Sequence, residues 1–279
     1  MARKIIIGIV LLFAVIGFFF AVVFVGMQFN IFSVRGAISS RNADLISTTS
    51  SATLSAVCTD HTTSHCAWNE TPEWAVLKAA FTKDAPVIDR VSRETGIPAR
   101  TLVAVIVPEQ TRFFTSDREL FKRVFEPLKI LGSMSQFSLG VSGIKQVTAL
   151  QIENYASSST SPFYPGPDIA QYMNYTSTST HDTELFNRLT DQHNHYYSYL
   201  YTAIFIKEIE AQWQRAGYDI SNDPGTIATL FNLGFKVSDP KAHPVIAGSI
   251  INTGGSSYVY GDLSTLFYNS QELRDIFPQ

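Results

Sequence analysis

The sequence predicts a mainly α-helical domain that follows an N-terminal membrane-spanning helix. No charged residue occurs between positions 5 and 29, in a run rich in Ile, Val, Leu and Phe. Between positions 182 and 216, apolar residues recur at spacings of three and four, which is typical of a helix with one buried face. No stretch shows the sustained alternation of a half-buried strand, and no internal repeat is visible. The fold class we expect is therefore mainly α.

The apolar run at 5–29 is long enough to cross a membrane, for which about 20 apolar residues suffice. Arg3 and Lys4 precede it, and the first charge after it is Arg35. Basic residues favour the cytoplasmic side, so we expect residues 1–4 inside and everything after the run outside. A cleaved signal peptide is the alternative, but its apolar core is usually about 7–15 residues long. The run therefore favours an uncleaved, single-pass signal anchor.

Net charge and aromatic content limit the kinds of molecule that the protein is expected to bind. The formal net charge of −3 argues against a nucleic-acid partner, which favours a basic surface. The 20 Phe and 12 Tyr suit a packed core and equally suit a groove that stacks sugar rings. The chain after the anchor is long enough for one sizeable core, so we expect a single domain at 71–279.

Residues 30–70 are rich in Ser and Thr and predict a linker between the anchor and the domain. The linker carries both cysteines of the chain, Cys58 and Cys66. In an exported chain such a pair predicts a disulfide, worth about 2–3 kcal/mol in the chain-entropy model. His61 and His65 lie between the cysteines, so zinc ligation is the alternative. The spacing matches no common zinc pattern, and we expect no metal.

The spacing of apolar residues, together with Pro and Gly at the expected helix ends, predicts the helices of the domain. We expect helices that begin near Pro72, at 85–95 with a C-terminal cap at Gly96, from Ile97-Pro98 to Pro108, and at 117–131, 143–156, 182–216, 224–235 and 260–270. The segment 157–180 is rich in Ser, Thr, Pro and Tyr, and a loop of this length is usually functional or disordered.

Glu109 is the most informative residue of the domain. It follows the apolar run 102–107 and Pro108, which cannot continue a helical hydrogen-bond ladder. We therefore expect the helix to end there and Glu109 to leave it at the wall of a cavity. Apolar surroundings disfavour the charged form of a carboxyl group and so raise its pKa. A general acid that works near neutral pH requires such a raised pKa. The alternative is a boundary residue that is exposed or paired with Arg112.

Three further segments supply glycine or polar residues that suit a ligand site. They are 138–149, which contains Ser138, Gly140 and Gly143; 228–234, which contains Asn232; and 254–261, which contains Tyr258 and Tyr260. Glycines permit close backbone approach or a positive φ, and a buried Asn needs a partner. Each tyrosine either lines a cleft or packs by its ring.

Other polar residues receive ordinary interpretations. His193 and His195 alternate along the predicted helix 182–216 and cannot share a face, so we expect them to be exposed. Glu153 is interpreted as a solvated helical charge. Asp117 suits an N-terminal cap better than a second catalytic acid.

The order of these segments resembles the lytic transglycosylase and goose-type lysozyme superfamily, which has a lysozyme-like α fold. The turn Gly96-Ile97-Pro98 and the helix into Glu109 resemble the family's opening pattern, in which the catalytic glutamate ends the second helix. The family's Gly-Leu-Met-Gln segment, followed shortly by Thr-Ala, is matched by Gly140 with Thr148-Ala149. Its Ala-x-Tyr-Asn-x-Gly segment is matched at Asn232 and Gly234. The resemblance covers most of residues 75–270.

The chain departs from the family pattern at three positions near these motifs. The residue after the glutamate is usually Ser and is Gln110 here. With Thr-Ala aligned, the family's substrate-contacting Gln falls on Gly143, and Phe231 replaces the usual Tyr. The stretches from Glu109 to Gly140 and from Ala149 to Asn232 are also longer than is usual.

The resemblance implies cleavage of the β-1,4 bond between N-acetylmuramic acid and N-acetylglucosamine in peptidoglycan. Glu109 would be the sole acid and base, with no cofactor, and Ser138, Gly140, Asn232, Tyr258 and Tyr260 would contact the glycan strand. Most glycoside hydrolases need two carboxyl groups, and no second acid stands out beside Glu109. The sequence thus favours a lytic transglycosylase held on the periplasmic side of a bacterial inner membrane.

Two alternatives remain open. The changes at Gly143 and Phe231 favour a non-catalytic lysozyme-like module that binds glycan strands or a partner within a cell-envelope complex. A weaker alternative is an exported α-helical adaptor with no role in glycan binding.

Overall fold

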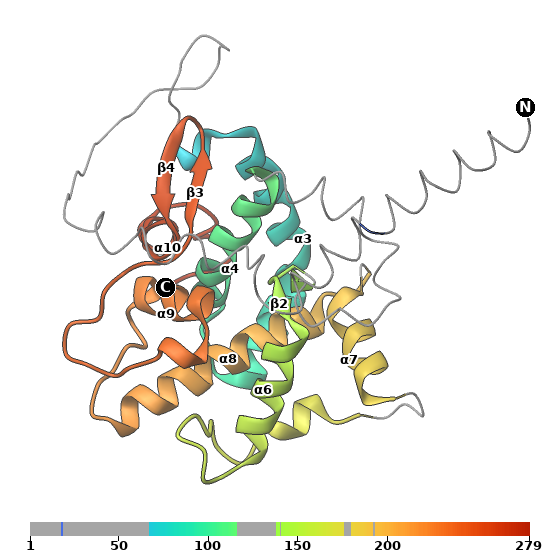
Figure 1. Ribbon diagram of the computed structural model, residues 1–279. Coiled ribbons are helices and arrows are strands. Elements are labelled where there is room, and N and C mark those ends of the chain that lie inside the picture. Colours follow the sequence, from blue (N-terminus) through green and yellow to red (C-terminus); the bar gives the residue numbers. More distant parts are fainter. Residues whose placement is uncertain (1–17, 19–66, 116–137, 140, 176–179, 192) are drawn as a thin grey trace, which may run out of the picture. The chain divides into compact units, whose positions relative to one another are not determined.

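The computed structural model describes residues 18, 67–115, 138–139, 141–175, 180–191 and 193–279 (Figure 1). From residue 67 onward, the described residues belong to one compact unit. Several predicted features lie outside them: the anchor at 5–29 apart from Phe18, Cys58 and Cys66 with His61 and His65, the helix at 117–131 with Asp117, and Gly140. Within the described part of the chain, no helix has the length and apolarity needed to cross a membrane.

The described unit is mainly α-helical, as predicted. Its helices are α3 (Pro72–Thr95), α4 (Ala99–Thr115), α6 (Gln146–Ser157), α7 (His181–Thr190), α8 (Tyr196–Arg215), α9 (Pro224–Leu233) and α10 (Tyr260–Asn269), with short 3-10 turns η1 (Trp68–Glu70), η4 (Ala170–Met173) and η5 (Phe235–Val237). Two antiparallel hairpins join them: β1 (Ser138–Leu139) with β2 (Ile144–Lys145), and β3 (Ile250–Thr253) with β4 (Ser256–Val259). The hairpins were not predicted.

Helix α8 lies at the centre of the fold, where it contacts α3, α6, α7 and α9 (Figure 1). Its residues from Ser198 to Ile206 are all buried, so apolar and small side chains occur all round this part of the helix. A helix that is apolar all round is expected to be enclosed on every side. Of the helices that carry predicted site residues, α9 packs against α8, while α4, α9 and α10 pack against each other.

Helix α3 is one continuous helix, whereas two helices were predicted. The buried side chains of Phe81 and Ile88 lie two turns apart on either side of Pro86, so one apolar stripe runs past the proline. The helix ends as predicted, with Gly96 at φ 76° donating its N–H to the Ser92 carbonyl at 2.8 Å. At its other end, Trp68 packs edge-on against Trp74, so the folded unit begins before residue 71.

The predicted helix at 182–216 is instead two helices, α7 and α8. Between them, Asp191 accepts hydrogen bonds from the backbone N–H groups of His193 and Asn194 at 2.8 and 3.0 Å. Asn194 in turn accepts from the N–H of Tyr196 at 3.1 Å. Side chains of Asp and Asn that capture nearby N–H groups compete with a helix, and this competition breaks the predicted one. His193 and His195 therefore lie in a turn, not on a helix.

Helices α9 and α10 approach closely because glycines lie at their contact. A methyl group at Gly261 would come within 2.5 Å of Thr229 Oγ1 and 2.7 Å of the Gly225 carbonyl. Asp223 caps the N-terminus of α9: its side chain accepts from the Thr226 N–H at 2.9 Å, and Pro224 is the first residue of the helix. This packing fixes α9, and with it Asn232, against α10 and α4.

Arg100 joins the start of α4 to the C-terminal end of the chain. The side chain is fully buried, and its guanidinium donates five hydrogen bonds to backbone carbonyls. The acceptors are Phe267, Tyr268, Ser270, Glu272 and Phe277, at 2.8 to 3.2 Å. Several of these carbonyls end α10, where unpaired carbonyls and the negative end of the helix dipole favour a cation.

We expect Arg100→Met to destabilise the domain by more than about 3 kcal/mol, because several buried carbonyls would lose their donor at about 1–3 kcal/mol each. Chemical denaturation of the variant and wild type measures this difference. Arg93→Met, which removes an exposed arginine of α3, should change stability by no more than about 0.5 kcal/mol. An Arg100→Met variant as stable as Arg93→Met would contradict the interpretation.

A second polar cluster joins α3 to α8. Asp84 of α3 accepts hydrogen bonds from His195 Nδ1 at 2.6 Å and from the Tyr199 hydroxyl at 2.8 Å. Burial raises the pKa of Asp84, but the hydrogen bonds from His195 and Tyr199 outweigh it and leave the pKa below its usual value. The hydrogen bond to Asp84 raises the pKa of His195. His195 is thus a partner in the core packing, not the exposed residue predicted.

These shifts predict a pH-dependent contribution to stability. The raised pKa of His195 gives stability that is complete below about pH 6.5, its unfolded value, and is lost as the pH rises through the folded pKa. The lowered pKa of Asp84 gives stability that is lost only below about pH 3.8. The melting temperature of wild type should therefore exceed that of His195→Gln by more at pH 5.5 than at pH 8.5. An equal or larger gap at pH 8.5 would contradict the sign.

Candidate functional site

Glu109 lies inside α4, which continues past Pro108 to Thr115; the predicted helix end at Pro108 is wrong. Pro108 has no N–H for the Ala104 carbonyl, which normally costs about 3 kcal/mol in a helix. Every residue from Leu102 to Val107 is fully buried, and this burial holds the helix across the proline. The Tyr260 hydroxyl also donates to the Val105 carbonyl at 3.1 Å. Glu109 is therefore held by a continuous helix and is 2 % exposed.

The carboxylate of Glu109 is paired with Arg112, one turn further along α4. Arg112 Nη2 donates to Glu109 Oε1, and the two side chains are 9 % and 3 % exposed, respectively. The pairing with Arg112 was one of the alternatives predicted for Glu109. A buried carboxylate is costly unless it is paired, so this ion pair explains how the charge is tolerated.

Gly143 brings the turn of the β1–β2 hairpin directly against the carboxyl group of Glu109. A Cβ atom at Gly143 would lie 2.3 Å from Glu109 Oε1 and 2.9 Å from its Cγ and Cδ. The backbone of Gly143 has φ 65°, a conformation that side chains disfavour. The neighbouring Gln110 side chain donates to the Val141 carbonyl and so ties α4 to the same turn. Gly143 is therefore required by the site for both space and conformation.

Asn232 is buried near the end of α9, at 2 % exposure. Its Oδ1 accepts hydrogen bonds from the backbone N–H and the hydroxyl of Ser249, at 3.0 and 3.1 Å. Because a backbone N–H can only donate, these bonds fix which end of the amide is the oxygen. The opposite Nδ2 is buried and has no partner. Asn232 is thus half satisfied, and its amide donor is available to an acceptor.

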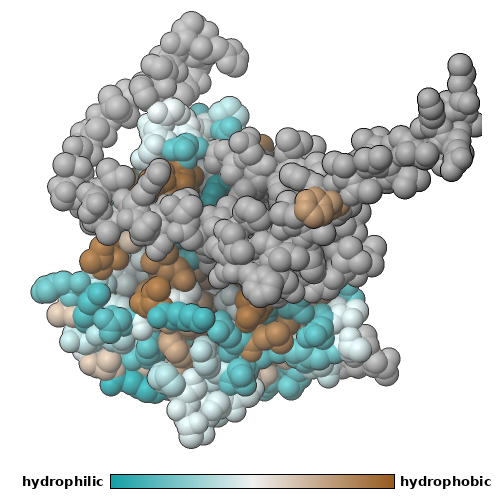
Figure 2. Space-filling view, in the orientation of Figure 1, coloured by the Kyte–Doolittle hydropathy of each residue, from teal (hydrophilic) through white to brown (hydrophobic). Residues whose placement is uncertain are grey.

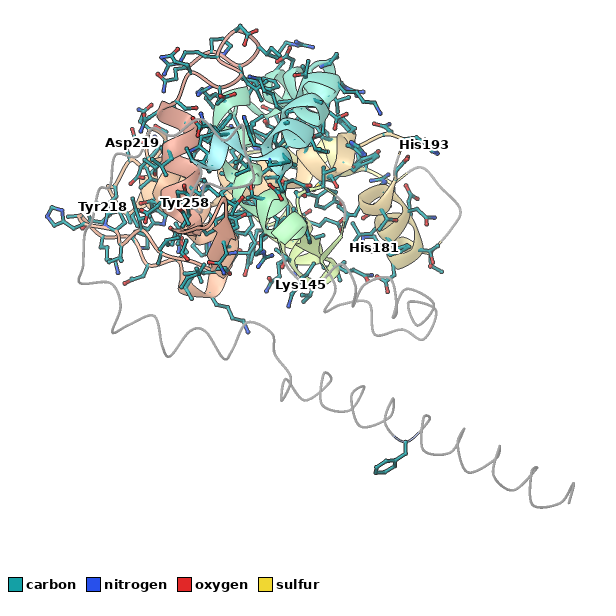
Figure 3. The ribbon with its side chains drawn as sticks, turned by 90° about the horizontal axis from the view of Figure 1, so that it is seen from above. Lys145, His181, His193, Tyr218, Asp219 and Tyr258 are labelled. Carbon is teal, nitrogen blue, oxygen red and sulfur yellow. The ribbon has the colours of Figure 1, made fainter. Side chains whose placement is uncertain are left out.

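The two predicted tyrosines have different positions. Tyr260 is fully buried at the start of α10, so the packing alternative holds for it and it does not line an exposed surface. Tyr258 lies in β4 opposite Ile251 and is partly buried. Figure 3 shows Tyr258 on the part of the molecule formed by the β3–β4 hairpin and α10. Tyr258 remains a candidate for ligand contact.

The remaining predicted site residues are only partly described. Ser138 lies in β1 and is paired with Lys145 of β2, but its side chain is outside the described atoms. Gly140, in the same hairpin, lies outside the described residues. The structure thus brings two of the residues singled out from the sequence into contact: Glu109 and Gly143, which lies in the turn between β1 and β2.

Glu153 was predicted to be a solvated charge, and this prediction is wrong. The side chain is 15 % exposed and accepts hydrogen bonds from the hydroxyl groups of Tyr175 and Tyr201. It also interacts with His181 Nε2 at 2.8 Å, and His181 is labelled in Figure 3. Burial and the bond to Glu153 raise the pKa of both tyrosines. The cluster attaches the segment after α6 and the start of α7 to α6 and α8.

Burial also raises the pKa of two acidic residues of α8. Burial raises the pKa of Glu208 well above its usual value, and neither carboxyl oxygen has a partner. Burial also raises the pKa of Glu210 to about 7. The sequence of this helix gives no signal that distinguishes Glu208 and Glu210 from exposed helical charges.

The surface around the described unit is mixed in character. Figure 2 shows apolar side chains among polar ones on the face viewed. Exposed large apolar residues include Val147 and Leu150 of α6, Leu233 at the end of α9, and Val237 of η5. Val147 and Leu150 follow closely after the Gly143 turn in sequence. No group of three or more His, Cys, Asp or Glu residues that could hold a metal ion occurs among the residues that the structure describes.

Comparisons with known proteins give no match: no family model, no curated protein and no solved structure matches this chain. The family resemblance therefore depends on the motifs at Glu109, Gly140, Thr148-Ala149 and Asn232. The geometry around Glu109 is independent of that resemblance.

We expect Gly143→Ala to displace Glu109 and to destabilise the domain by about 1–3 kcal/mol more than a matched glycine substitution, because its methyl group overlaps the carboxyl. Gly217→Ala is the control, since Gly217 also has a positive φ, at 88°, but nothing lies within 4 Å of the added atom. Denaturant midpoints of the two variants measure the difference. Equal losses would show that Gly143 is needed for its backbone conformation alone.

Proposed function

We propose that this domain is a lytic transglycosylase that cleaves the β-1,4 bond between N-acetylmuramic acid and N-acetylglucosamine in peptidoglycan. The observation that carries the proposal is the contact between Glu109 and the Gly143 turn. A carboxylate that follows the apolar run 102–107 of α4 is kept 2 % exposed, and a glycine backbone leaves room for nothing larger beside it. Such a placement of a titratable group is common at functional sites.

The reaction needs one carboxyl group that serves first as acid and then as base. Glu109 gives its proton to the glycosidic oxygen as the bond to C1 of the muramic residue breaks. It then takes the proton of the C6 hydroxyl of that residue, and the C6 oxygen bonds to C1 to form the 1,6-anhydro ring. Glu109 is restored, and no water is consumed. This scheme needs no second carboxylate, whereas an inverting or retaining hydrolase needs two.

Asn232 supports the proposal as a ligand-binding residue. Its Oδ1 is fixed by Ser249, so the buried Nδ2 has a set direction and no partner. A buried donor without an acceptor is uncommon in folded proteins and often marks a site that a ligand completes. An N-acetyl or hydroxyl oxygen of a sugar is a suitable acceptor. Tyr258, partly buried in β4, offers a ring for stacking against a sugar.

The lysozyme-like fold and the periplasmic location at the inner membrane belong to the same proposal. Their support is the order of the motifs and the apolar run at 5–29, which follows Arg3 and Lys4. A domain held near the membrane by such a run has access to the inner face of the cell wall. The disulfide between Cys58 and Cys66 is proposed for the same exported compartment.

The ion pair between Glu109 and Arg112 favours a second candidate function. Arg112 occupies Oε1 of the carboxyl group and both side chains are buried, so this oxygen is not free to contact a glycosidic oxygen. The second candidate is a non-catalytic lysozyme-like module that binds glycan strands, alone or within a cell-envelope complex. It also agrees with Gly143 and Phe231 in place of the family's usual residues.

Digestion of purified sacculi by the full-length chain separates the two functions. Wild type should release anhydro-muropeptides, detected by mass spectrometry, and Glu109→Gln should release at least about a hundredfold less, as is typical on loss of a general acid. Reducing-end products would indicate hydrolysis and a second carboxylate. If wild type and Glu109→Gln both bind sacculi and neither releases products, the domain is a binding module.

A further inference from the structure

Arg112 has an unusual set of partners for a buried arginine. Its side chain is 9 % exposed, and its Nη2 donates to Glu109 Oε1. Its Nε is buried and has no hydrogen-bond partner. A buried N–H without an acceptor is unfavourable, since the group has lost its water and gained nothing in return. Arg112 is therefore incompletely satisfied in the structure described.

The other buried arginines of the described residues, Arg100 and Arg188, make a kind of contact that Arg112 lacks. Arg100 and Arg188 donate to backbone carbonyls of segments distant from their own, and so connect elements of the fold. The ion pair of Arg112 is with Glu109 of the same helix, so this pair links no two elements. Its position beside the candidate acid, rather than a role in joining segments, is what distinguishes Arg112.

The unused N–H of Arg112 has a chemical preference. The Nε and Nη2 atoms lie on one edge of the planar guanidinium, and their two N–H groups match the two oxygens of a carboxylate. In this structure Glu109 occupies Nη2 and leaves Nε empty. The edge is thus half of a carboxylate-binding site, next to the carboxyl group that we propose as the acid.

We propose that Arg112 recognises a carboxylate on the ligand, and that this carboxylate takes the guanidinium from Glu109. The inference rests on the proposed glycan substrate. Its anionic group is the lactyl carboxylate of N-acetylmuramic acid residues that carry no stem peptide. Binding satisfies both N–H groups on the edge and releases Glu109 from its ion pair. The site therefore binds peptide-free, anionic glycan strands more tightly than strands whose lactyl groups carry stem peptides.

The test measures binding and cleavage with the full-length chain in detergent micelles. Two soluble ligands are compared: peptide-free oligomers of alternating N-acetylglucosamine and N-acetylmuramic acid, and the same oligomers with each lactyl carboxylate converted to its amide. Calorimetric titration gives the affinity for each, and mass spectrometry detects cleavage. The protein variants are Arg112→Met, Arg112→Lys and, as a control, Arg90→Met, which removes an exposed arginine that pairs with Glu94 on α3.

Wild type and Arg90→Met should bind the carboxylate form at least about tenfold more tightly than the amide, the effect of one charge-assisted pair. Arg112→Met should bind the two forms equally, and Arg112→Lys, which keeps the charge but not the two-donor edge, should retain only part of the preference. The Lys variant also keeps the test decisive if Arg112→Met does not fold, which circular dichroism will show.

Each outcome is decisive and separable from the proposed reaction. Equal binding of both ligands by wild type, a preference that persists in Arg112→Met, or no binding of either ligand would overturn the inference. Selective binding without cleavage would uphold Arg112 as the recognition residue and reject the transglycosylase. Cleavage of both ligands without preference would support the transglycosylase and reject Arg112 as the recognition residue.

Discussion

The buried guanidinium of Arg100 is the interaction on which the arrangement of the described unit depends. From the start of α4, it donates hydrogen bonds to the carbonyls that end α10 and to those of the turns after it. A charge with 0 % exposure is tolerated because five carbonyl oxygens surround it. Helix α4 is thereby fixed at its first turn, and Glu109 lies further along the same helix. The position of the candidate acid is set at a distance by this cluster.

The other end of α4 is fixed by smaller groups, and here the constraint is space. The Gly143 backbone occupies the position where any side chain would meet the Glu109 carboxyl. Gln110 holds the same turn through the Val141 carbonyl. A rigid, enclosed carboxylate is well placed for chemistry, but enclosure also forces it to have a charged partner, which Arg112 provides. The site therefore holds Glu109 in position and paired with Arg112 at the same time, so the proposed reaction requires a ligand to displace Arg112 from the carboxyl group.

Much of the helical framework could be predicted from the sequence because local signals and tertiary packing agree. Gly96 ends α3, Asp223 and Pro224 begin α9, and the spacing of apolar residues identifies each helix. The errors arise where tertiary packing overrides a local signal, as at Pro86 and Pro108, both of which lie inside helices held by burial on each side.

The unpredicted β3–β4 hairpin is a different kind of error, because a short-range signal for it is present in the sequence. Gly254-Gly255, with φ values of 58° and 73°, forms the two-residue turn of the β3–β4 hairpin, and such a pair is a strong hairpin signal. Within the site, Glu109 and Gly143 could be singled out from sequence because a carboxylate after an apolar run and a glycine before a helix are locally unusual. Their mutual contact could not, since it depends on how the β1–β2 turn packs on α4.

The continuation of α4 past Pro108 changes the physical setting of Glu109. A glutamate that leaves a helix at its end can turn toward solvent at little cost, whereas one within the helix has its direction set by the helical geometry. That geometry places Arg112 one turn away on the same face, so the helix itself creates the ion pair. A break at Pro108 would have separated Glu109 from Arg112. The same proline that predicted a helix end therefore lies in the segment that keeps the carboxylate buried and paired.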